Sequence, residues 1–267
     1  MVLTIIQQLI LGVVQGITEW LPISSSAFLI LIMTNFFGIT DIGVLIHTDL
    51  FFHLGTFLAA LIFFRKDVWK LIKTLFRYKK ADSEHQEILR FIIIATLISG
   101  AIGFLILAGL KNFQDITRIT GKTITFGIGF LLLITAGIQL RIKAKGLRKA
   151  RDIKNKDSIL LGFVQGVSAL PGISRSGITV SALLLKKFDD TTALRLSFLL
   201  SLPVILIGNI ILNLEDMIFS STAIYGILAS FIFGLLTIAG LMKLSKKINF
   251  GWFVLIFAVL MMLSILI

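Results

Sequence analysis

Cysteine is absent from this chain, and proline and histidine each occur only three times among its 267 residues. The absence of cysteine excludes disulfides, thiolate nucleophiles and thiolate metal sites. The three histidines argue against a multi-histidine zinc site, and neither His47 nor His85 has neighbours that suggest a role. Acidic residues are scarce as well: 14 stand against 26 lysines and arginines, which gives a formal net charge of +12.

Apolar residues, in contrast, make up 57% of the chain. The mean hydropathy of +0.99 exceeds what a water-soluble core needs, so the sequence predicts a single polytopic membrane domain. The basic residues stand in short stretches between apolar runs, a pattern typical of cytoplasmic loops, and we expect no nucleic-acid partner. The first residues have neither a basic region nor a cleavage site, so we interpret them as mature protein.

Six apolar runs are long enough, the shorter ones with flanking residues, to cross a bilayer, which takes about 20 residues. These runs are 47–64, 91–109, 123–140, 191–212, 223–243 and 248–267. Two spans separate the basic loops 65–90 and 141–157, which places both loops on the same side. The positive-inside rule makes that side the cytoplasm. We therefore predict a multi-pass protein of the inner (plasma) membrane.

One pattern occurs twice in the chain. Leu11–Ser26 reads LGVVQGITEWLPISSS, and Leu161–Ser176 reads LGFVQGVSALPGISRS. Each copy is apolar and is broken near its middle, at Leu21-Pro22 or at Leu170-Pro171-Gly172. Paired breaks of this kind are typical of a site built where two internal repeats meet.

The positions of the loops determine how the two halves are inserted. Residues 158–187 must start and end in the cytoplasm, and residues 1–46 must start and end outside. We predict that each segment is a re-entrant helical hairpin followed by three transmembrane helices, which gives an all-α inverted-topology repeat. Repeat 1 covers 1–140, the basic linker covers 141–157, and repeat 2 covers 158–267.

The two copies differ in charge at the breaks, because Glu19 corresponds to Ala169 and Arg175 corresponds to Ser25. Gln15 and Glu19 are spaced i, i+4 and share a helix face. A carboxylate at this depth is costly unless it faces a cavity, a cation or a partner, so Glu19 is a functional candidate. A hydrated carboxylate near the surface is the alternative for Glu19, and a simple interhelix hydrogen bond is the alternative for Gln15.

Small polar residues surround the charged residues of both breaks: Ser24, Ser25, Ser26, Gly172, Ser174, Ser176 and Gly177. The serines begin predicted helices, whose free N–H groups and positive dipole end favour an anion. One hydroxyl could be a nucleophile beside a base, although N-capping is the alternative for any single serine. Arg175 at a helix start requires a compensating anion, for which phosphate is the natural partner, or it extends to a membrane surface.

Asp49 and His53 form a second i, i+4 pair, near the outer end of the first span. They could orient the residues that bind the ligand directly, or they could act as an acid–base pair. A structural histidine near a helix end is the alternative.

At these residues the sequence resembles the undecaprenyl pyrophosphate phosphatase family, also called bacitracin-resistance proteins. One signature of the family appears as Gln15, Glu19, Leu21, Pro22 and the run Ser24–Ser26, and the other, Pro-Gly-x-Ser-Arg-Ser-Gly, is unbroken from Pro171 to Gly177. The segment Asp49–Thr56 and the stretch Ser197–Pro203 also look like family sequence, so the resemblance covers nearly the whole chain.

The resemblance implies an integral membrane enzyme that hydrolyses C55-isoprenyl diphosphate to the monophosphate and so recycles the lipid carrier of cell-wall polymers. It makes Glu19 a catalytic or metal-coordinating acid, Ser25 a nucleophile or phosphate ligand, and Arg175 the phosphate clamp. Ser24, Ser26, Ser174 and Ser176 become phosphate donors. Mg²⁺ or Ca²⁺ is the implied cofactor, held by Glu19 together with substrate phosphate.

The chain departs from the family at Ala27-Phe28, where the family usually has Gly-His. A weakened paralogue is therefore an alternative, and a prenyl-phosphate flippase is another, because inverted repeats with broken helices are transporter architecture. We expect the site to open to the outer face and the substrate to be a membrane lipid. A homodimer is compatible with the sequence, which does not fix the oligomeric state.

Overall fold

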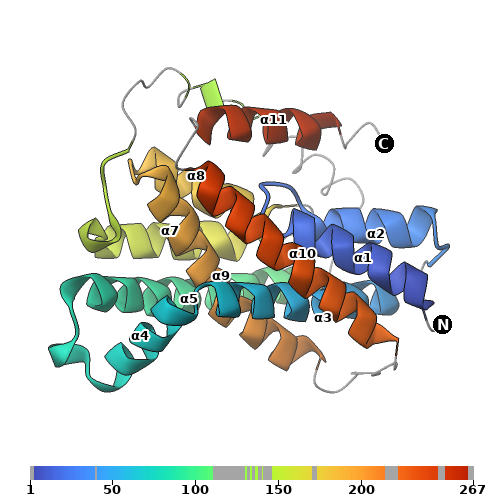
Figure 1. The fold of residues 1–267 in the computed structure, drawn as a ribbon, viewed down its shortest axis with the longest axis horizontal. Helices are drawn as coiled ribbons and strands as arrows, with labels where there is room; N and C mark the ends of the chain where they lie inside the picture. The colour runs from blue at the N-terminus through green and yellow to red at the C-terminus, as the bar shows by residue number, and fades with distance from the viewer. Residues whose placement is uncertain are drawn as a thin grey trace.

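The computed structural model describes residues 3–39, 41–110, 146–169, 173–213, 222–245 and 250–263, together with positions 130, 133, 136, 137 and 140. Within these residues the regular structure is helical, apart from an isolated bridge between Arg148 and Phe188, so the all-α prediction is confirmed. The elements are α1 Ile5–Thr18, α2 Ser25–Asn35, α3 Ile42–Phe63, α4 Arg65–Phe76, η1 Tyr78–Lys80, α5 Ser83–Leu110, η2 Ala150–Asp152, α7 Asn155–Val167, α8 Arg175–Leu185, α9 Asp190–Asn213, α10 Ala223–Leu244 and α11 Phe250–Leu263 (Figure 1).

Four helices are long and apolar enough to cross a membrane: Gly43–Phe63, Ser83–Ile106, Asp190–Ile210 and Ala223–Leu244. They overlap four of the six predicted runs, and the chain is a multi-pass membrane protein. Most of the predicted run 123–140 lies outside the described residues. Of the last run, the structure describes α11, and the positions on either side of this helix lie outside the described residues.

The segment 65–90, predicted as a basic loop, is instead largely helical. It contains α4 and η1, and α5 already begins at Ser83 rather than at 91. The prediction was wrong because it searched for continuous apolar runs, whereas α4 and the start of α5 carry apolar residues only on some of their faces. α3 begins at Ile42 instead of 47, where Asp41 caps it, and α7 begins at Asn155, inside the predicted linker.

Two pairs of short helices flank the predicted breaks. α1 ends at Thr18 and α2 begins at Ser25, so the chain is non-helical around Leu21-Pro22, as predicted. α7 ends at Val167 and α8 begins at Arg175. The second break, Leu170–Gly172, lies outside the described residues.

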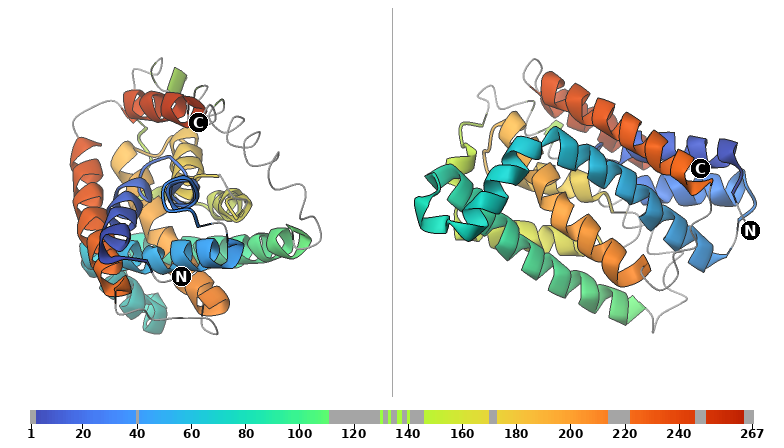
Figure 2. Two further views of the ribbon diagram at one scale, coloured as in Figure 1. Left: turned by 90° about the vertical axis from the view of Figure 1, so that its right-hand side faces the viewer. Right: turned by 60° about the horizontal axis from the view of Figure 1, so that its bottom comes forward.

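Each of these first helices packs closely on a long helix from the other half of the chain. α1 lies along α10, and α7 lies along α5 (Figures 1 and 2). Glycines allow the close approach: a Cβ atom on Gly12 would lie 2.2 Å from the carbonyl oxygen of Gly226, and one on Gly162 would lie 2.7 Å from the Cβ of Ile98. Gly16 and Gly166 lie one turn further along their helices. Gly16 makes the same kind of close contact with α10, and Gly166 makes it with α5.

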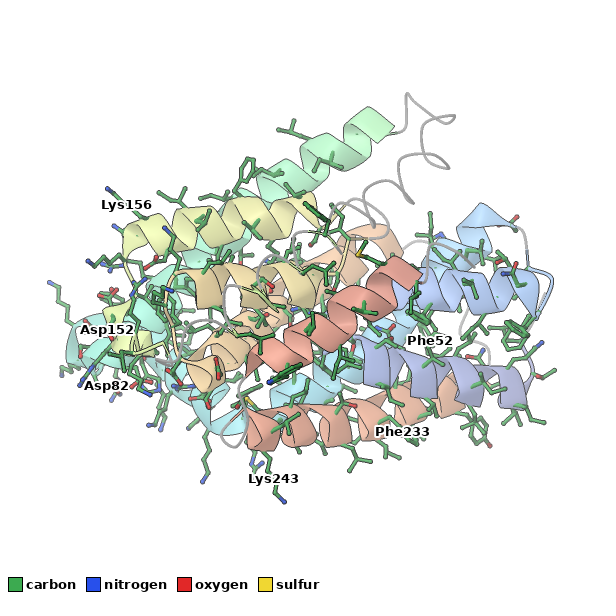
Figure 3. The ribbon with its side chains drawn as sticks, turned by 90° about the horizontal axis from the view of Figure 1, so that it is seen from above. Phe52, Asp82, Asp152, Lys156, Phe233 and Lys243 are labelled. Atoms are coloured by element: carbon green, nitrogen blue, oxygen red, sulfur yellow. The ribbon has the colours of Figure 1, made fainter. Side chains whose placement is uncertain are left out.

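Charged side chains gather at one end of the bundle, where Figure 3 labels Asp82, Asp152 and Lys156. The Arg195 guanidinium on α9 lies 2.6 Å from both Asp67 of α4 and Glu84 of α5. These ion pairs tie three helices together at the end of the apolar spans.

Candidate active site

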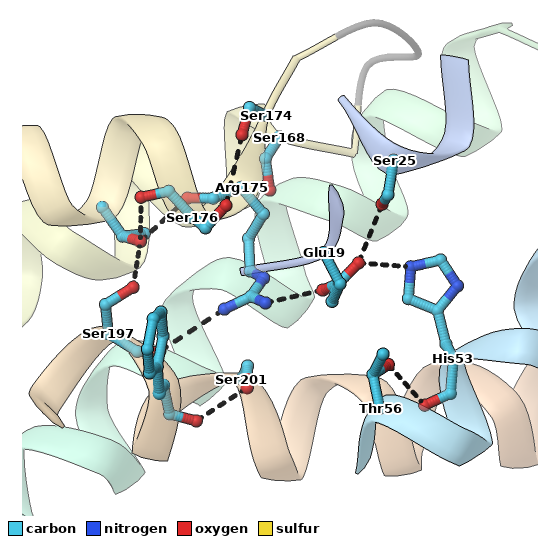
Figure 4. Close-up of polar contacts among 12 residues, drawn as sticks. Glu19, Ser25, His53, Thr56, Ser168, Ser174, Arg175, Ser176, Ser197 and Ser201 are labelled. Carbon is cyan, nitrogen blue, oxygen red and sulfur yellow. Dashed lines mark hydrogen bonds and ion pairs between the residues drawn. The ribbon is translucent and has the colours of Figure 1, made fainter. Parts of the chain in front are cut away.

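Glu19 is the centre of a buried polar cluster at the end of α1. Only 5% of the residue is exposed. Its Oε2 atom accepts a hydrogen bond from the Ser25 hydroxyl at 2.8 Å and lies 3.0 Å from His53 Nε2 (Figure 4). The same oxygen accepts from the Gln15 amide at 3.1 Å. The i, i+4 spacing of Gln15 and Glu19 therefore does place both side chains on one face. A carboxylate held by so many donors is fixed in orientation.

Arg175 comes to this carboxylate from the other half of the chain. It is the first residue of α8, and its Nη2 atom donates to Glu19 Oε1 at 2.6 Å. Its Nη1 atom donates to the backbone carbonyl of Ser197 on α9 at 3.4 Å. The anion that an arginine at a helix start was predicted to need is, in this structure, Glu19.

Asp49 and His53 of α3 complete the acidic side of the cluster. His53 Nδ1 lies 2.7 Å from the backbone carbonyl of Asp49, and because a carbonyl only accepts, this nitrogen carries a proton. The other ring nitrogen, Nε2, lies 3.0 Å from Glu19 Oε2, so His53 contacts the carboxylate directly. Asp49 Oδ2 accepts from the Ser26 hydroxyl at 2.7 Å.

The remaining predicted residues connect the two breaks to each other. The Ser176 hydroxyl donates to the carbonyl of Leu21 at 2.6 Å, and Ser174 lies 3.5 Å from the same oxygen. A Cβ atom on Gly177 would lie 3.2 Å from Cα of Pro22, so the close approach here is that of backbone. Ser24 and Ser174 also accept from backbone N–H groups as the N-caps of α2 and α8. Gly172 lies outside the described residues.

Two residues that the sequence did not single out, Trp20 and Thr179, contact the arginine, and Ser197 joins them. Trp20, 1% exposed, has its ring centroid 5.8 Å from the guanidinium carbon of Arg175. The Thr179 hydroxyl contacts Ser197 Oγ at 2.7 Å and so joins α8 to α9. The family-like stretch from Ser197 was a signal for this side of the site, but it did not reveal which helix the stretch would meet.

The side chains present are suited to a hard cation only in part. Their carboxylate and hydroxyl oxygens are the donors that Mg²⁺ and Ca²⁺ prefer, and Asp49 Oδ1 is buried without a hydrogen-bond partner. Both oxygens of Glu19, however, are already held by donors. Among the described residues no three acidic or histidine side chains are arranged to hold a metal. A divalent cation therefore fits here only together with oxygens from a bound phosphate.

Known proteins resemble this chain over nearly its whole length. The profile of the family described as "Bacitracin resistance protein BacA" matches residues 8–263. The chain belongs to this family. Within the BacA family it is 40% identical to the undecaprenyl-diphosphatase of Methanococcoides burtonii, over 98% of both chains. It is also 36% identical to the undecaprenyl-diphosphatase of Methanothrix thermoacetophila, over 93% of this chain and 92% of that one.

A third relative is undecaprenyl-diphosphatase 2 of Halalkalibacterium halodurans. It is 35% identical to this chain, over 94% of this chain and 92% of its own. Phe28, which stands where we expected the family histidine, lies on α2 one turn beyond Ser25 and is 36% exposed. The imidazole that reaches Glu19 in this BacA protein is that of His53.

Proposed function

We propose that this protein is an integral membrane phosphatase that hydrolyses undecaprenyl (C55-isoprenyl) diphosphate to undecaprenyl phosphate and inorganic phosphate. This reaction would return the lipid carrier to cell-wall synthesis. The observation that carries the proposal is the buried pair of Glu19 and Arg175, which joins an acid and a guanidinium from the two breaks at 2.6 Å. The names of its relatives supply the substrate.

Binding would begin at the guanidinium. A terminal phosphoryl group that enters the cluster can replace Glu19 as the partner of Arg175, because a guanidinium binds phosphate oxygens in the same two-pronged way as a carboxylate. The N-terminus of α2, with Ser24, Ser25 and Ser26, and that of α8, with Ser174 and Ser176, would add N–H and hydroxyl donors. The prenyl chain would remain in lipid between the helices.

The chemical step would break the bond between the terminal phosphorus and the bridging oxygen. The nucleophile is either water or the Ser25 hydroxyl, and Glu19, 2.8 Å from that hydroxyl, would take its proton. Undecaprenyl phosphate leaves with the electron pair of the broken bond. If Ser25 attacks, water then hydrolyses the phosphoserine; if water attacks, inorganic phosphate forms directly. Arg175 stabilises the charge that develops on the phosphoryl oxygens.

A divalent cation, Mg²⁺ or Ca²⁺, would be held by Glu19 together with the diphosphate, with Asp49 as a further oxygen donor. When bound, it would neutralise negative charge on the diphosphate. Gln15 and His53 would keep the Glu19 carboxylate oriented toward the reacting phosphoryl group.

We also propose that the two halves are inverted repeats, 1–140 and 158–267, whose re-entrant hairpins meet within the membrane. The pairing of α1 with α10 and of α7 with α5 supports this, because each hairpin helix then packs on the second span of the opposite half. The basic segments 65–90 and 141–157 would lie in the cytoplasm and the site would open outward. A homodimer stays a prediction.

Two alternatives make different predictions. A prenyl-phosphate flippase would move lipid between leaflets of proteoliposomes without releasing phosphate. A catalytically weakened paralogue would bind prenyl phosphates and gain turnover when histidine is restored by Phe28→His.

The experiment that tests the proposal is phosphate release from C55-isoprenyl diphosphate by the purified protein. Glu19→Gln and Arg175→Gln should each lower kcat about 100-fold or more, since each removes preorganised charge from the reacting group. The matched controls are Glu87→Gln and Arg90→Gln, which break an ion pair on α5 outside the cluster. The proposal fails if wild-type protein releases no phosphate, or if the site variants keep the turnover of the controls.

A further inference from the structure

The helix α4 has three distinct faces. Asp67, Leu71 and Thr74, spaced i, i+4, i+7, form the stripe that faces the bundle: Leu71 and Thr74 are buried, and Asp67 bonds Arg195. A second stripe, at the same spacing, consists of the exposed lysines Lys66, Lys70 and Lys73. The third stripe is apolar and exposed, and nothing described in the structure covers it.

The apolar stripe consists of large side chains. Trp69 is 59% exposed, Leu75 57% and Phe76 80%, and Ile72 between them is 43% exposed. A contiguous stripe of this kind on a short helix marks a surface that binds something apolar. The basic stripe lies directly beside it, and the Lys73 ammonium is 5.2 Å from the centroid of the Trp69 ring.

The position of α4 determines which occupant this surface fits. α3, a candidate membrane span, ends at Phe63, and α4 begins at Arg65, so a single residue separates α4 from the end of the apolar span. Figure 1 shows that α4 turns away from the direction of α3 and α5 at that end of the bundle. A helix so joined is held at the boundary between the hydrocarbon core and the head groups.

Charge distinguishes among the possible membrane surfaces. The segment 65–80 contains seven lysines and arginines and a single acidic residue, Asp67. That acidic residue is already paired with Arg195, so the positive charge of the segment is not balanced within it. A helix with an apolar face, a tryptophan and adjoining lysines is typical of segments that lie in the interface of anionic membranes.

We propose that α4 is an interfacial helix that binds anionic phospholipid. Trp69, Ile72, Leu75 and Phe76 enter the boundary of the acyl chains, and Lys66, Lys70 and Lys73 contact the phosphate groups of the lipid heads. This surface is separate from the Glu19–Arg175 cluster and does not depend on the proposed phosphatase activity. The Asp67–Arg195 ion pair holds the helix in the rotation that presents these two faces outward.

Because the chain has no cysteine, single labels can be placed on each face of the full-length protein. Leu75→Cys and Lys70→Cys would each carry a nitroxide. The protein would be placed in vesicles of phosphatidylcholine with about 30% phosphatidylglycerol, which give the membrane a negative surface. We expect the label at 75 to be relaxed by oxygen more than by a water-soluble nickel complex, and the label at 70 to show the opposite. Equal nickel access at both positions would overturn the proposal. So would dipolar broadening at 75, because that would place a second copy of the chain on this face.

A second measurement tests the selectivity for anionic lipid. Wild-type protein should show a higher thermal midpoint in phosphatidylglycerol-containing vesicles than in pure phosphatidylcholine. Changing Lys66, Lys70 and Lys73 to Gln should remove at least half of that difference. The control changes Arg151, Lys154 and Lys156 to Gln, basic residues that lie outside α4. The proposal is wrong if the control and the α4 variant lose the same share of this difference in thermal midpoint, or if the α4 variant keeps all of it.

Discussion

At the scale of single residues, Glu19 is a buried carboxylate whose two oxygens are divided between two sets of partners. One oxygen faces Arg175, and the other faces Ser25, Gln15 and His53. A buried charge is tolerated only when it is paired and hydrogen-bonded, and this carboxylate is both. The division also fits a phosphatase, because a phosphate can displace the guanidinium from one oxygen while the other remains oriented.

His53 should therefore matter more for turnover than position 28. We expect His53→Gln to lower kcat about 100-fold, since the imidazole orients the carboxylate that takes the proton, and a positioned general base contributes on this order. Phe28→His should change kcat by less than about threefold, because His53 already contacts Glu19. Steady-state phosphate release gives both values. A rise in turnover with Phe28→His, together with an unchanged His53→Gln variant, would favour the weakened-paralogue alternative.

The sequence predicted these residues unequally, and the reason is distance along the chain. Gln15 and Glu19 are one helical turn apart, so their shared face could be read directly from the spacing. The bond from Ser176 to the carbonyl of Leu21 depends on how two distant breaks meet, and spacing within one segment does not contain that information. Trp20 was missed for the same reason, because its contact with Arg175 crosses between the halves.

At the scale of helices, the short pairs α1–α2 and α7–α8 are held by close backbone packing at their first members. Gly12 and Gly162 occupy equivalent places in the two copies of the repeated pattern, and both face a helix of the opposite half. Small residues four apart are the usual means by which membrane helices approach closely. The sequence contains this signal twice, but it does not indicate which helix is the partner.

Adding one methyl group at such a contact should be costly. We expect Gly162→Ala to lower the free energy of unfolding by about 1–3 kcal/mol, the usual range for overpacking, because the new Cβ would meet the backbone of Ala95 at 2.9 Å. Gly100→Ala on α5 is the matched control, since none of the described residues outside its own helix lies within 4 Å of the position that its Cβ would take. Thermal unfolding in detergent measures both. Equal stability of the two variants would contradict the close packing of α7 on α5.

The base of the α7–α8 pair is held by Arg148, which donates to the Asp157 carboxylate and to the carbonyl of Lys186. Burial alone would raise the pKa of Asp157. The hydrogen bonds from Arg148 and from the Lys154 backbone N–H outweigh burial, so the pKa lies below its ordinary value of 3.8. A lowered folded-state pKa adds stability above that ordinary value, and the stability is lost as the pH falls through the folded pKa.

Arg148→Gln should accordingly lower the free energy of unfolding by about 1–3 kcal/mol at pH 7, the range for hydrogen bonds to a charged group. The difference from wild type should shrink as the pH falls from 3.8 through the lowered pKa of Asp157 in the folded wild type, because protonation removes the charge that Arg148 contacts. Thermal melts across this pH range measure it, with Arg151→Gln as the control. A difference that stays constant with pH would show that Asp157 is not the partner that matters.

At the scale of the whole molecule, a polar cluster is enclosed by two parts of the chain that are far apart in sequence. Hydropathy and loop charge predicted the four described spans because a bilayer requires long apolar helices. They did not predict α4, because its apolar residues lie on part of its surface and do not form a long continuous run. The charge difference between the two copies singled out Glu19 and Arg175, and in the structure these two groups lie 2.6 Å apart.

The most direct test of the central claim is whether these two groups act on the diphosphate as one unit. Phosphate release from C55-isoprenyl diphosphate should be measured for Glu19→Gln, for Arg175→Gln and for the double variant. Residues that act together give non-additive losses, so the double variant should be no more than a few-fold slower than the worse single variant. Losses that multiply, or an Arg175→Gln variant that keeps its turnover, would contradict a shared catalytic site.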